Sequence, residues 1–393
     1  MRERIRHLFL ACASAALLFL LSGIPAAAQQ KDAKIKYELK EFLGLQIPPG
    51  LDVFALRIPA DNPITPEKVE LGRLLFFDRA LSSDNTVSCA DCHHPNLAFT
   101  DGRPVATGIR GQKGGRSAPT LINRAFSASQ FWDGRAGSLE QQAKGPMLDP
   151  LEMGNRSHED IVVRLERLDV YRGLFKEAFG TESITIDRVA QAIATFERTL
   201  LSGNSPFDRH QRGDAGAVSA SARRGFDLFR GKAQCDTCHT GFNFTDEQFH
   251  TLGSSYQRSD SDLGLFHVTK RQGDKGKFKT PTLREIANTG PYMHDGRFRT
   301  LEEVVDFYGR GGIDGGRCVP AGIGGLNSLG LPLPVPGALP RVLQQRLPAG
   351  LGSAPTEIVP LNLSQKDKRD LVEFLKSLSG EGWQHVEPPD RNP

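Results

Sequence analysis

Two short stretches decide the fold of this 393-residue chain: Cys89-Ala-Asp-Cys92-His93 and Cys235-Asp-Thr-Cys238-His239. A Cys-x-x-Cys-His motif attaches c-type haem, because its two thiols bond to the porphyrin vinyl groups and the adjacent histidine ligates the iron. A thioredoxin-like redox pair or half of a zinc site uses similar cysteine spacing. Neither alternative explains a histidine directly after both pairs. The two stretches therefore predict two covalently bound haem c groups.

The residues around the two motifs also repeat. Gly72-Arg-Leu-Leu-Phe76 precedes the first motif, and Gly225-Phe-Asp-Leu-Phe229 precedes the second. Phe-Thr-Asp follows both motifs, at residues 99–101 and 244–246. Each half therefore reads as a helix, a haem-attachment turn and a capping loop, which is the plan of a cytochrome c domain. The sequence predicts a mainly α protein with two cytochrome c-like haem domains that arose by internal duplication, with long irregular loops.

Capping residues and apolar stripes predict the individual helices. Thr65-Pro66 predicts a helix that runs to about Phe77, because proline is tolerated in the first turn of a helix. The pattern Ser157-His-Glu-Asp160 predicts a helix that continues to about Phe179. Further helices are expected from the apolar stripe at 186–200, from the capping box formed by Thr300 and Glu303, and after Ser364. No long alternation typical of a β-strand is present.

Composition shifts predict the domain boundaries. The stretch 203–217 is rich in Gly, Asn, Pro and Asp and is predicted to be a linker. Residues 309 to about 360 are rich in Gly and Pro and are predicted to form a long loop or flap. We expect an N-terminal haem domain over residues 36–205 and a C-terminal haem domain over residues 216–380.

The N-terminus has the features of a secretory signal peptide. Three arginines precede a short apolar run, Leu8 to Leu21, which is followed by Pro25-Ala-Ala-Ala-Gln29. This pattern predicts a signal peptide over residues 1–28 and a periplasmic location. The run is shorter than the ~18 apolar residues of a membrane span, and no later run approaches that length, so no span is expected after cleavage. An uncleaved anchor is the alternative.

The overall composition excludes several classes of protein. At 38% hydrophobic and 24% charged residues, the chain is not collagenous, coiled-coil or mainly disordered. The 49 basic and 46 acidic residues give a net charge of +3, which is too balanced to indicate nucleic-acid binding. Cys318 lies unpaired in the Gly-rich stretch and is assigned no role.

Three further stretches, 116–123, 131–154 and 290–312, resemble the bacterial di-haem cytochrome c peroxidases and their relative MauG, which oxidises a protein substrate. The resemblance covers roughly residues 50–310 and the last helix. It implies an enzyme that reacts with hydrogen peroxide at the N-terminal haem and receives electrons through the C-terminal haem. The implied partner is a small donor protein, either a c-type cytochrome or a cupredoxin, or a protein substrate. A homodimer is also left open.

The resemblance implies that the haem on Cys89 and Cys92, with His93 as proximal ligand, binds the peroxide. Gln142 and Glu152 then match the distal-pocket glutamine and glutamate of the family. A carboxylate beside an open iron can take a proton from peroxide and return it to the departing oxygen. On composition alone, Glu152 would be an exposed loop acid that caps a neighbouring backbone group, but the context Pro150-Leu-Glu-Met-Gly154 favours the distal-pocket role.

Two other residues match the region between the haems and the distal pocket. Trp132 matches a tryptophan that lies between the two haems, where its ring could carry electrons. It could also be a core aromatic residue, and both roles are compatible. Pro146 matches a proline that shapes the distal pocket.

Two departures from the peroxidase pattern concern iron ligands. The position of the distal histidine that closes the peroxidatic iron, counted back from Arg116, is Ile109, which cannot ligate iron. The second haem, on Cys235 and Cys238 with His239, has a tyrosine, Tyr308, where peroxidases have methionine. Tyrosinate is a known haem ligand. The alternatives are a core tyrosine bonded to a carbonyl, with Met293 as the substitute ligand.

The resemblance also implies a calcium ion between the haems. Its carbonyl ligands match Thr289 and Pro291, which suits an oxygen-seeking cation. The family's side-chain ligand is usually asparagine, but Ser117 occupies that position. His294 is expected to contact a haem propionate.

The sequence leaves three alternative functions open. The first is a cytochrome c peroxidase-like enzyme. The second is MauG-like oxidation of a protein or other substrate through a His/Tyr-ligated second haem, although the stretch 231–234 lacks the tryptophan that MauG uses for that route. The third is a non-catalytic di-haem electron carrier. The open position at Ile109, together with Gln142 and Glu152, favours an enzyme.

Overall fold

The computed structural model describes residues 45–253, 262–312 and 358–389. Residues from Ile47 onward belong to one compact unit. The predicted signal peptide, the first nine residues of the predicted N-terminal domain, Cys318 and most of the predicted Gly/Pro-rich loop lie outside the described residues. Within the described ranges, no helix combines the length and the apolar character needed to cross a bilayer.

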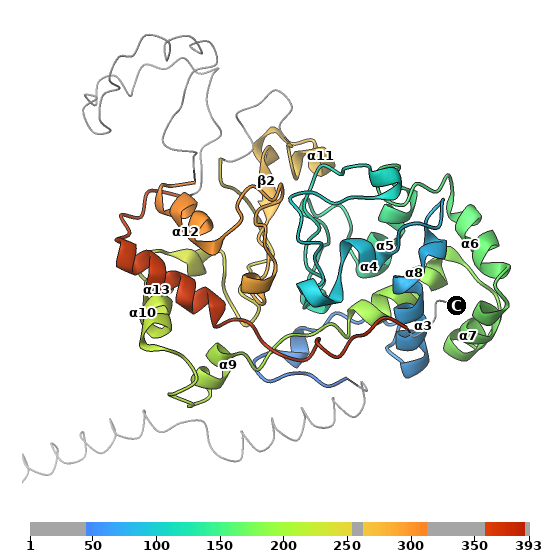
Figure 1. Cartoon of the computed structure of the whole chain (residues 1–393), viewed down its shortest axis with the longest axis horizontal. Coiled ribbons are helices and arrows are strands. Elements are labelled where there is room, and N and C mark those ends of the chain that lie inside the picture. The colour runs from blue at the N-terminus through green and yellow to red at the C-terminus, as the bar shows by residue number, and fades with distance from the viewer. Residues whose placement is uncertain (1–44, 254–261, 313–357, 390–393) are drawn as a thin grey trace, which may run out of the picture. The chain divides into compact units, whose positions relative to one another are not determined.

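The described chain is mainly helical, as predicted, and Figure 1 shows its helices joined by loops, some of which are long. The α-helices are α3 (Pro66–Phe77), α4 (Cys89–Cys92), α5 (Leu139–Leu148), α6 (His158–Glu166), α7 (Asp169–Phe179), α8 (Ile186–Glu197), α9 (Pro206–Gln211), α10 (Ala220–Arg230), α11 (Phe266–Thr269), α12 (Leu301–Gly309) and α13 (Gln365–Lys376). Single 3₁₀ turns connect them: η1 (Val53–Ala55), η2 (Arg79–Leu81), η3 (Pro95–Leu97), η4 (Ile109–Gly111), η5 (Arg124–Phe126), η6 (Cys235–Thr237), η7 (Gln272–Asp274) and η8 (Ile286–Asn288).

The described strands are β1 (Phe249–Thr251) and β2 (Lys277–Lys279), which pair antiparallel with Phe249 opposite Lys279. Three residues are too few to leave a readable alternation in the sequence.

The predicted helix starts at Thr65, Thr300 and Ser364 are confirmed, because each of these side chains accepts a hydrogen bond from the helix's first turn.

One predicted helix was wrong in its length. The segment from Ser157 to Phe179 forms two helices, α6 and α7, because Leu168 leaves the helical region with φ −99° and ψ 99°. Leu168 packs against the same buried cluster that contains Ile161 and Phe175. The break lets both short helices turn their apolar faces to that cluster, whereas one straight helix would carry α7 away from it.

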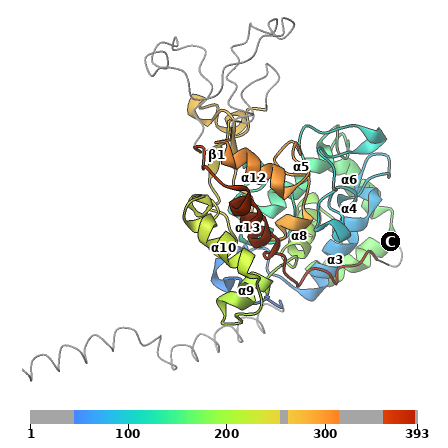
Figure 2. The same ribbon diagram turned by 60° about the vertical axis from the view of Figure 1, so that its left-hand side comes forward.

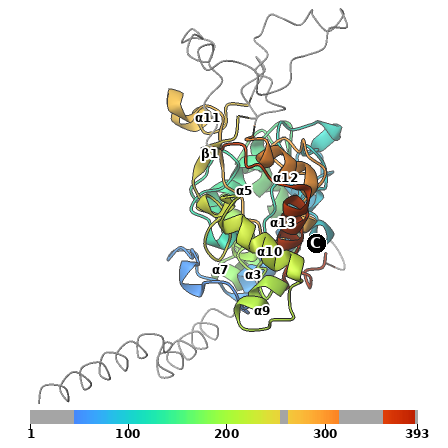
Figure 3. The ribbon, with the colours of Figure 1, turned by 90° about the vertical axis from the view of Figure 1, so that its left-hand side faces the viewer.

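Two helix pairs repeat the same crossing. In the first pair, α3 crosses α8 where a Cβ at Gly72 would lie 1.9 Å from the carbonyl oxygen of Ala192. In the second pair, α10 crosses α13 where a Cβ at Gly225 would lie 1.9 Å from the carbonyl oxygen of Asp370. Figure 3 shows α10 and α13 lying against each other. Only glycine permits this approach, so the repeated glycine seen in the sequence fixes one crossing in each cytochrome c-like domain.

Each helix pair has its own hydrophobic core, and α12 packs on the second pair beside α13 (Figure 2). The tail that follows α13 runs towards α3 in Figure 1. There Trp383 and Val386 join a cluster with Phe76, Phe99 and Phe196. Within the predicted linker, α9 places Phe207 in the core of the second pair. The two haem-motif regions are therefore joined by packed side chains.

Candidate functional site

Both motif histidines are held with one ring nitrogen available to a metal. His93 Nδ1 lies 3.1 Å from the carbonyl oxygen of Phe99, and His239 Nδ1 lies 3.0 Å from the carbonyl oxygen of Phe244. Because a carbonyl can only accept, Nδ1 carries the proton and Nε2 keeps its lone pair. Burial lowers the pKa of both histidines, which favours the neutral imidazole that ligates iron.

No disulfide joins the four motif cysteines, although each pair has the spacing of a redox disulfide. Burial raises the pKa of Cys89, Cys92 and Cys235 above the ordinary thiol range. Buried neutral thiols of this kind are not reactive redox cysteines, whose pKa is lowered. The arrangement instead suits thiols that are consumed in covalent attachment.

The structure reveals a second repeat, which the sequence analysis missed. Residues 119–146 match residues 281–308 without a gap. Asn123 and Glu285 share φ 60°, and Phe131 and Met293 adopt φ 68° and 73°. The carbonyls of the two prolines that open the repeats, residues 119 and 281, both face the motif histidines. The signal was readable as Pro-Thr-Leu and Asp-Gly-Arg in both copies.

The repeat pairs two residues that the sequence analysis had treated separately. Pro146 in α5 and Tyr308 in α12 each stand eight residues after the N-cap of their helix, Ser138 or Thr300. The ligand candidate of the second haem therefore has a proline as its counterpart at the first. Proline has no side-chain donor atom, so this position cannot close the first iron.

Glu152 and Ile109 lie together beside the first motif. The backbone N–H of Ile109 donates to the carbonyl oxygen of Glu152 at 2.8 Å. A Cβ at Gly154, whose φ is +64°, would lie 2.3 Å from Ile109 Cδ1. Glycine is thus required for the loop after Glu152 to close on Ile109. Ile109, the apolar residue at the position expected for a closing histidine, therefore lies against the loop that carries Glu152, the expected distal acid.

The charge of Glu152 acts on the first attachment motif. Burial, assisted by Asp149, raises the pKa of Glu152 to about 7, while Arg135 opposes the rise. Glu152 in turn contributes to the raised pKa of Cys92, after burial. A carboxyl group that titrates near neutrality can both accept and donate a proton at working pH. Gln142 is half-buried on α5, one turn before Pro146.

Tyr308 lies over the second motif. Burial raises its pKa, and Cys235 and Cys238 raise it further, so the phenol is within electrostatic reach of both thiols. No described residue makes a hydrogen bond with the Tyr308 hydroxyl, whereas a core tyrosine normally finds a partner. Met293, the alternative ligand, instead matches Phe131 of the first repeat and precedes α12.

Trp132 connects the two motif regions through backbone atoms. Its Nε1–H donates to the carbonyl of Ser117 at 2.9 Å, and the N–H of Ser117 donates to the carbonyl of His294 at 2.7 Å. Its own carbonyl accepts from the N–H of Lys279 at 2.9 Å. His294 is the counterpart of Trp132 in the second repeat, and its ring stacks on Phe278 with the centroids 3.7 Å apart.

These observations test whether the chain fits two haem groups. Each motif offers two thiols, a neutral imidazole with a free Nε2, and a glycine-dependent helix crossing. The buried side-chain polar atoms left without a partner in the described chain belong to Ser83, Asp101, Glu197 and Trp383. Asp101 and Glu197 act electrostatically on the first-motif cysteines. The residues present fit two attached haems.

Known proteins share this plan. A sequence model described as di-haem cytochrome c peroxidase matches residues 66–216. The methylamine utilization protein MauG of Methylorubrum extorquens is 40% identical over 324 residues, which are 82% of this chain and 81% of MauG. The chain belongs to the di-haem cytochrome c peroxidase family, which includes MauG.

Other members of the family support the same assignment. Cytochrome-c peroxidase IdrP1 of Pseudomonas sp. (strain SCT) is 33% identical over 363 residues, which are 84% of this chain and 86% of IdrP1. The crystal structure of a MauG-like protein associated with microbial copper homeostasis is 32% identical, with a TM-score of 0.70, and covers 88% of this chain and 97% of that one. Membership of the di-haem peroxidase family confirms the predicted fold class, the two haem c groups and the class of enzyme, a peroxide-reactive di-haem oxidoreductase.

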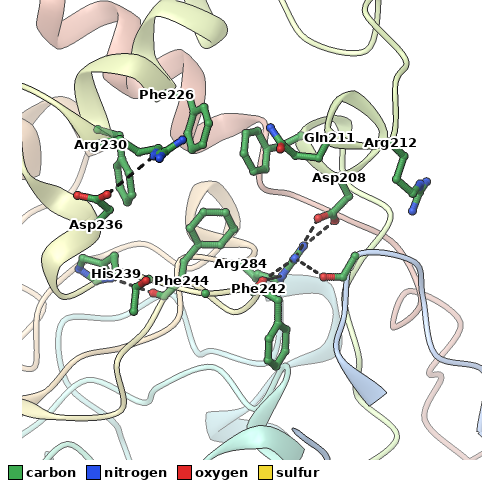
Figure 4. Close-up of a pocket in the computed structure, with 15 residues that line it drawn as sticks. Asp208, Gln211, Arg212, Phe226, Arg230, Asp236, His239, Phe242, Phe244 and Arg284 are labelled. Atoms are coloured by element: carbon green, nitrogen blue, oxygen red, sulfur yellow. Dashed lines mark hydrogen bonds and ion pairs between the residues drawn. The ribbon is translucent and has the colours of Figure 1, made fainter. Parts of the chain in front are cut away.

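A cavity of about 440 Å³ lies beside His239 (Figure 4). Arg284 and Asp208 both line this cavity and are joined directly by two hydrogen bonds of 2.6 and 3.0 Å. Arg284 is 1% exposed and also donates to the carbonyl of Phe242. This buried ion pair was not predicted from the sequence. The residue that matches Arg284 in the first repeat is Ile122. A charge that replaces a core isoleucine was the available signal.

The predicted calcium ligands lie on one segment. Ser117 is 8% exposed and bonds to that segment through His294, while Thr289 and Pro291 lie just before His294. The structure thus brings the side-chain position of the family's calcium site close to its carbonyl positions. Among described His, Cys and acidic side chains, the group with ligand atoms all within 4.8 Å is Cys238, Asp246 and His250, at the second attachment motif.

Proposed function

We propose that this protein reduces hydrogen peroxide at the haem on Cys89 and Cys92, with electrons supplied through the haem on Cys235 and Cys238. One observation carries the proposal: Pro146 and Tyr308 occupy equivalent places on α5 and α12, the helices that match in the repeat of residues 119–146 and 281–308. The first haem would then have one proposed ligand among the described residues, His93, and the second would have two, His239 and Tyr308. One open and one closed iron is the division of labour that peroxide chemistry requires.

Haem supplies the iron that binds peroxide and the electrons that cleave it. The chain supplies the protons. Reduction of one peroxide consumes two electrons and two protons and yields two waters. Glu152, with its raised pKa, takes the proton from the entering peroxide and returns it to the oxygen that leaves. Gln142 offers an amide that both donates and accepts beside Pro146, and Ile109 keeps an imidazole out of the ligand position.

Tyr308 supports a second candidate function. An anionic oxygen ligand favours ferric iron and lowers its potential, which suits oxidation of a substrate more than simple electron entry. The hydrogen bonds that join Trp132 to the segment of His294 through Ser117 support a role for Trp132 in carrying electrons between the haems. The candidate is peroxide-dependent oxidation of a protein or another substrate.

The finer features of the proposal rest on the sequence and the family. They are a signal peptide over residues 1–28, a periplasmic location, and a calcium ion held by the carbonyls of Thr289 and Pro291. A small c-type cytochrome or cupredoxin would be the electron donor. The close approach of Ser117 to the segment of Thr289 and Pro291 supports the calcium position.

The test is a pair of measurements on the purified mature protein. A pyridine haemochrome assay should give two covalent haems, and electron paramagnetic resonance should give one high-spin and one low-spin ferric signal. Turnover with peroxide should then oxidise reduced cytochrome c. Two low-spin signals without turnover would indicate an electron carrier instead. Peroxide consumption without cytochrome c oxidation would favour the MauG-like candidate.

A further inference from the structure

Glu197 is a buried acid that the proposed chemistry does not use. It is the last residue of α8, is 4% exposed, and its Oε2 has no hydrogen-bond partner among the described residues. Two other buried acids, Asp208 and Asp370, are each paired with an arginine, Arg284 and Arg224. A buried carboxyl without such a partner is costly, and a natural core replaces it unless it serves a purpose.

The internal duplication shows that the core does not need an acid at this position. Phe196 packs against Gly72 in the first crossing, and Phe374 packs against Gly225 in the second. The residue after Phe374 is Leu375, a member of the second hydrophobic core. The same place on the same helix is therefore apolar in one domain and acidic in the other.

Glu197 lies at the edge of the first attachment motif. After burial, Glu197 makes the largest contribution to the raised pKa of Cys89. The neighbouring Phe196 contacts Phe76, with ring centroids 5.2 Å apart, and Cys89 packs against the same cluster. A haem attached at Cys89 would therefore feel the charge of Glu197 through a low-dielectric core.

Three charged side chains face Glu197. Arg198, the next residue, forms an ion pair with Glu140 of α5 at 2.7 Å. Arg124 of η5 approaches from the loop side and bonds to the neutral oxygen of Gln130. The two arginines lower the pKa of Glu197 and Glu140 raises it. Burial is the largest effect and brings the pKa to about 8.

Two cationic side chains on other helices packed on α8, Lys68 and Arg164, have partners of their own. Lys68 of α3 donates to Asn62 at 3.2 Å, and Arg164 of α6 donates to the carbonyl of Ala80 at 2.6 Å. Neither helix therefore supplies Glu197 with a permanent counter-charge. The charge at the first haem can therefore shift the protonation of the Glu197 carboxyl.

We propose that Glu197 takes up one proton when the first haem is reduced and releases it when that haem is oxidised. The electron comes from a one-electron donor protein and enters the ferric iron. The proton comes from water and bonds to a carboxylate oxygen of Glu197. Ferric haem carries one more positive charge than ferrous haem, so its reduction removes a charge that had favoured the carboxylate. The proposal rests on attachment of the first haem, but not on its reaction with peroxide.

The experiment is a spectroelectrochemical titration of the full-length holoprotein, with both haem potentials followed at several pH values. In the wild type, the first-haem potential should fall as pH rises, by up to about 59 mV for each tenfold drop in proton concentration. Glu197→Gln should abolish that slope, and the second haem of the same molecule serves as the internal control. Redox-difference infrared spectra should show a protonated carboxyl band on reduction of the wild type and none in Glu197→Gln.

Two other buried acids, Glu152 and Asp101, act on the same motif through Cys92. Glu152→Gln and Asp101→Asn are therefore the matched controls, and both should keep the slope. If the slope survives in Glu197→Gln, or is lost in either control instead, the proposal is wrong. Glu197→Leu, which installs the residue of the second domain, should fold and reproduce the Gln result. If the wild-type protein does not react with peroxide but its first-haem potential still depends on pH, the proposed function is wrong and this inference stands.

Discussion

The backbone N–H of Ile109 donates to the carbonyl oxygen of Glu152 at 2.8 Å. This bond joins the loop that lacks a closing histidine to the loop that carries the acid. The two features could have been independent substitutions along the chain. Ile109 is itself 3% exposed, and burial raises the pKa of Glu152. The proposed open ligand position and the proposed proton-transfer group therefore form one structural unit.

Replacement of Glu152 by Gln should slow the reaction with peroxide by about 10²–10⁴-fold, which is the usual worth of general acid–base assistance. Both haem spectra should be nearly unchanged, because the amide keeps the shape of the side chain. Stopped-flow mixing of the ferric protein with peroxide measures the rate. Glu140→Gln is the control for removing a carboxylate away from the motif. An unchanged rate in Glu152→Gln would leave the residue as a structural loop acid.

The peroxide reaction of the wild type should depend on pH through Glu152. Its pKa is raised to about 7, and a general base must be ionised, so the rate should rise as pH increases through 7 and then level off. Arg135 lowers this pKa, so Arg135→Gln should move the inflection to higher pH. A pH series of stopped-flow rates tests both statements. An inflection that persists in Glu152→Gln would assign it to another group.

Tyr308→Phe should remove the proposed oxygen ligand while keeping the ring that packs against Phe307. The second haem should lose its low-spin spectrum and its potential should rise, because an anionic donor is gone. Electron paramagnetic resonance and a redox titration measure both changes. Met293→Leu is the matched control and should change neither. A sulfur-to-iron charge-transfer band that vanishes in Met293→Leu would instead identify methionine as the ligand.

Gly225→Ala should destabilise the second helix pair, because its Cβ would lie 1.9 Å from the carbonyl oxygen of Asp370. Overpacking of this kind costs about 1–3 kcal/mol in the free energy of unfolding. Gly173→Ala in α7 is the control. A Cβ there has no atom within 4 Å, so the change should stabilise the protein by about 0.5–1 kcal/mol. Denaturant unfolding of the holoprotein compares the two variants, and equal midpoints would contradict the proposed crossing.

The sequence by itself determined the chemistry that local spacing can encode. Two Cys-x-x-Cys-His motifs name their cofactor because attachment needs only neighbouring residues. The helix starts at Thr65, Thr300 and Ser364 were predictable because a cap is a contact within one turn. The helix break at Leu168 was not, because it depends on how two apolar faces reach one core.

Only the tertiary structure decided which side chains act together. Glu152 meets Ile109, and Glu197 reaches Cys89, across long stretches of chain that no local pattern connects. The equivalence of Pro146 and Tyr308 was present in the sequence, but it gained meaning only when Tyr308 proved to lie within electrostatic reach of the second attachment motif. Electrostatic effects depend on burial and on through-space distance, and both are set by packing rather than by spacing.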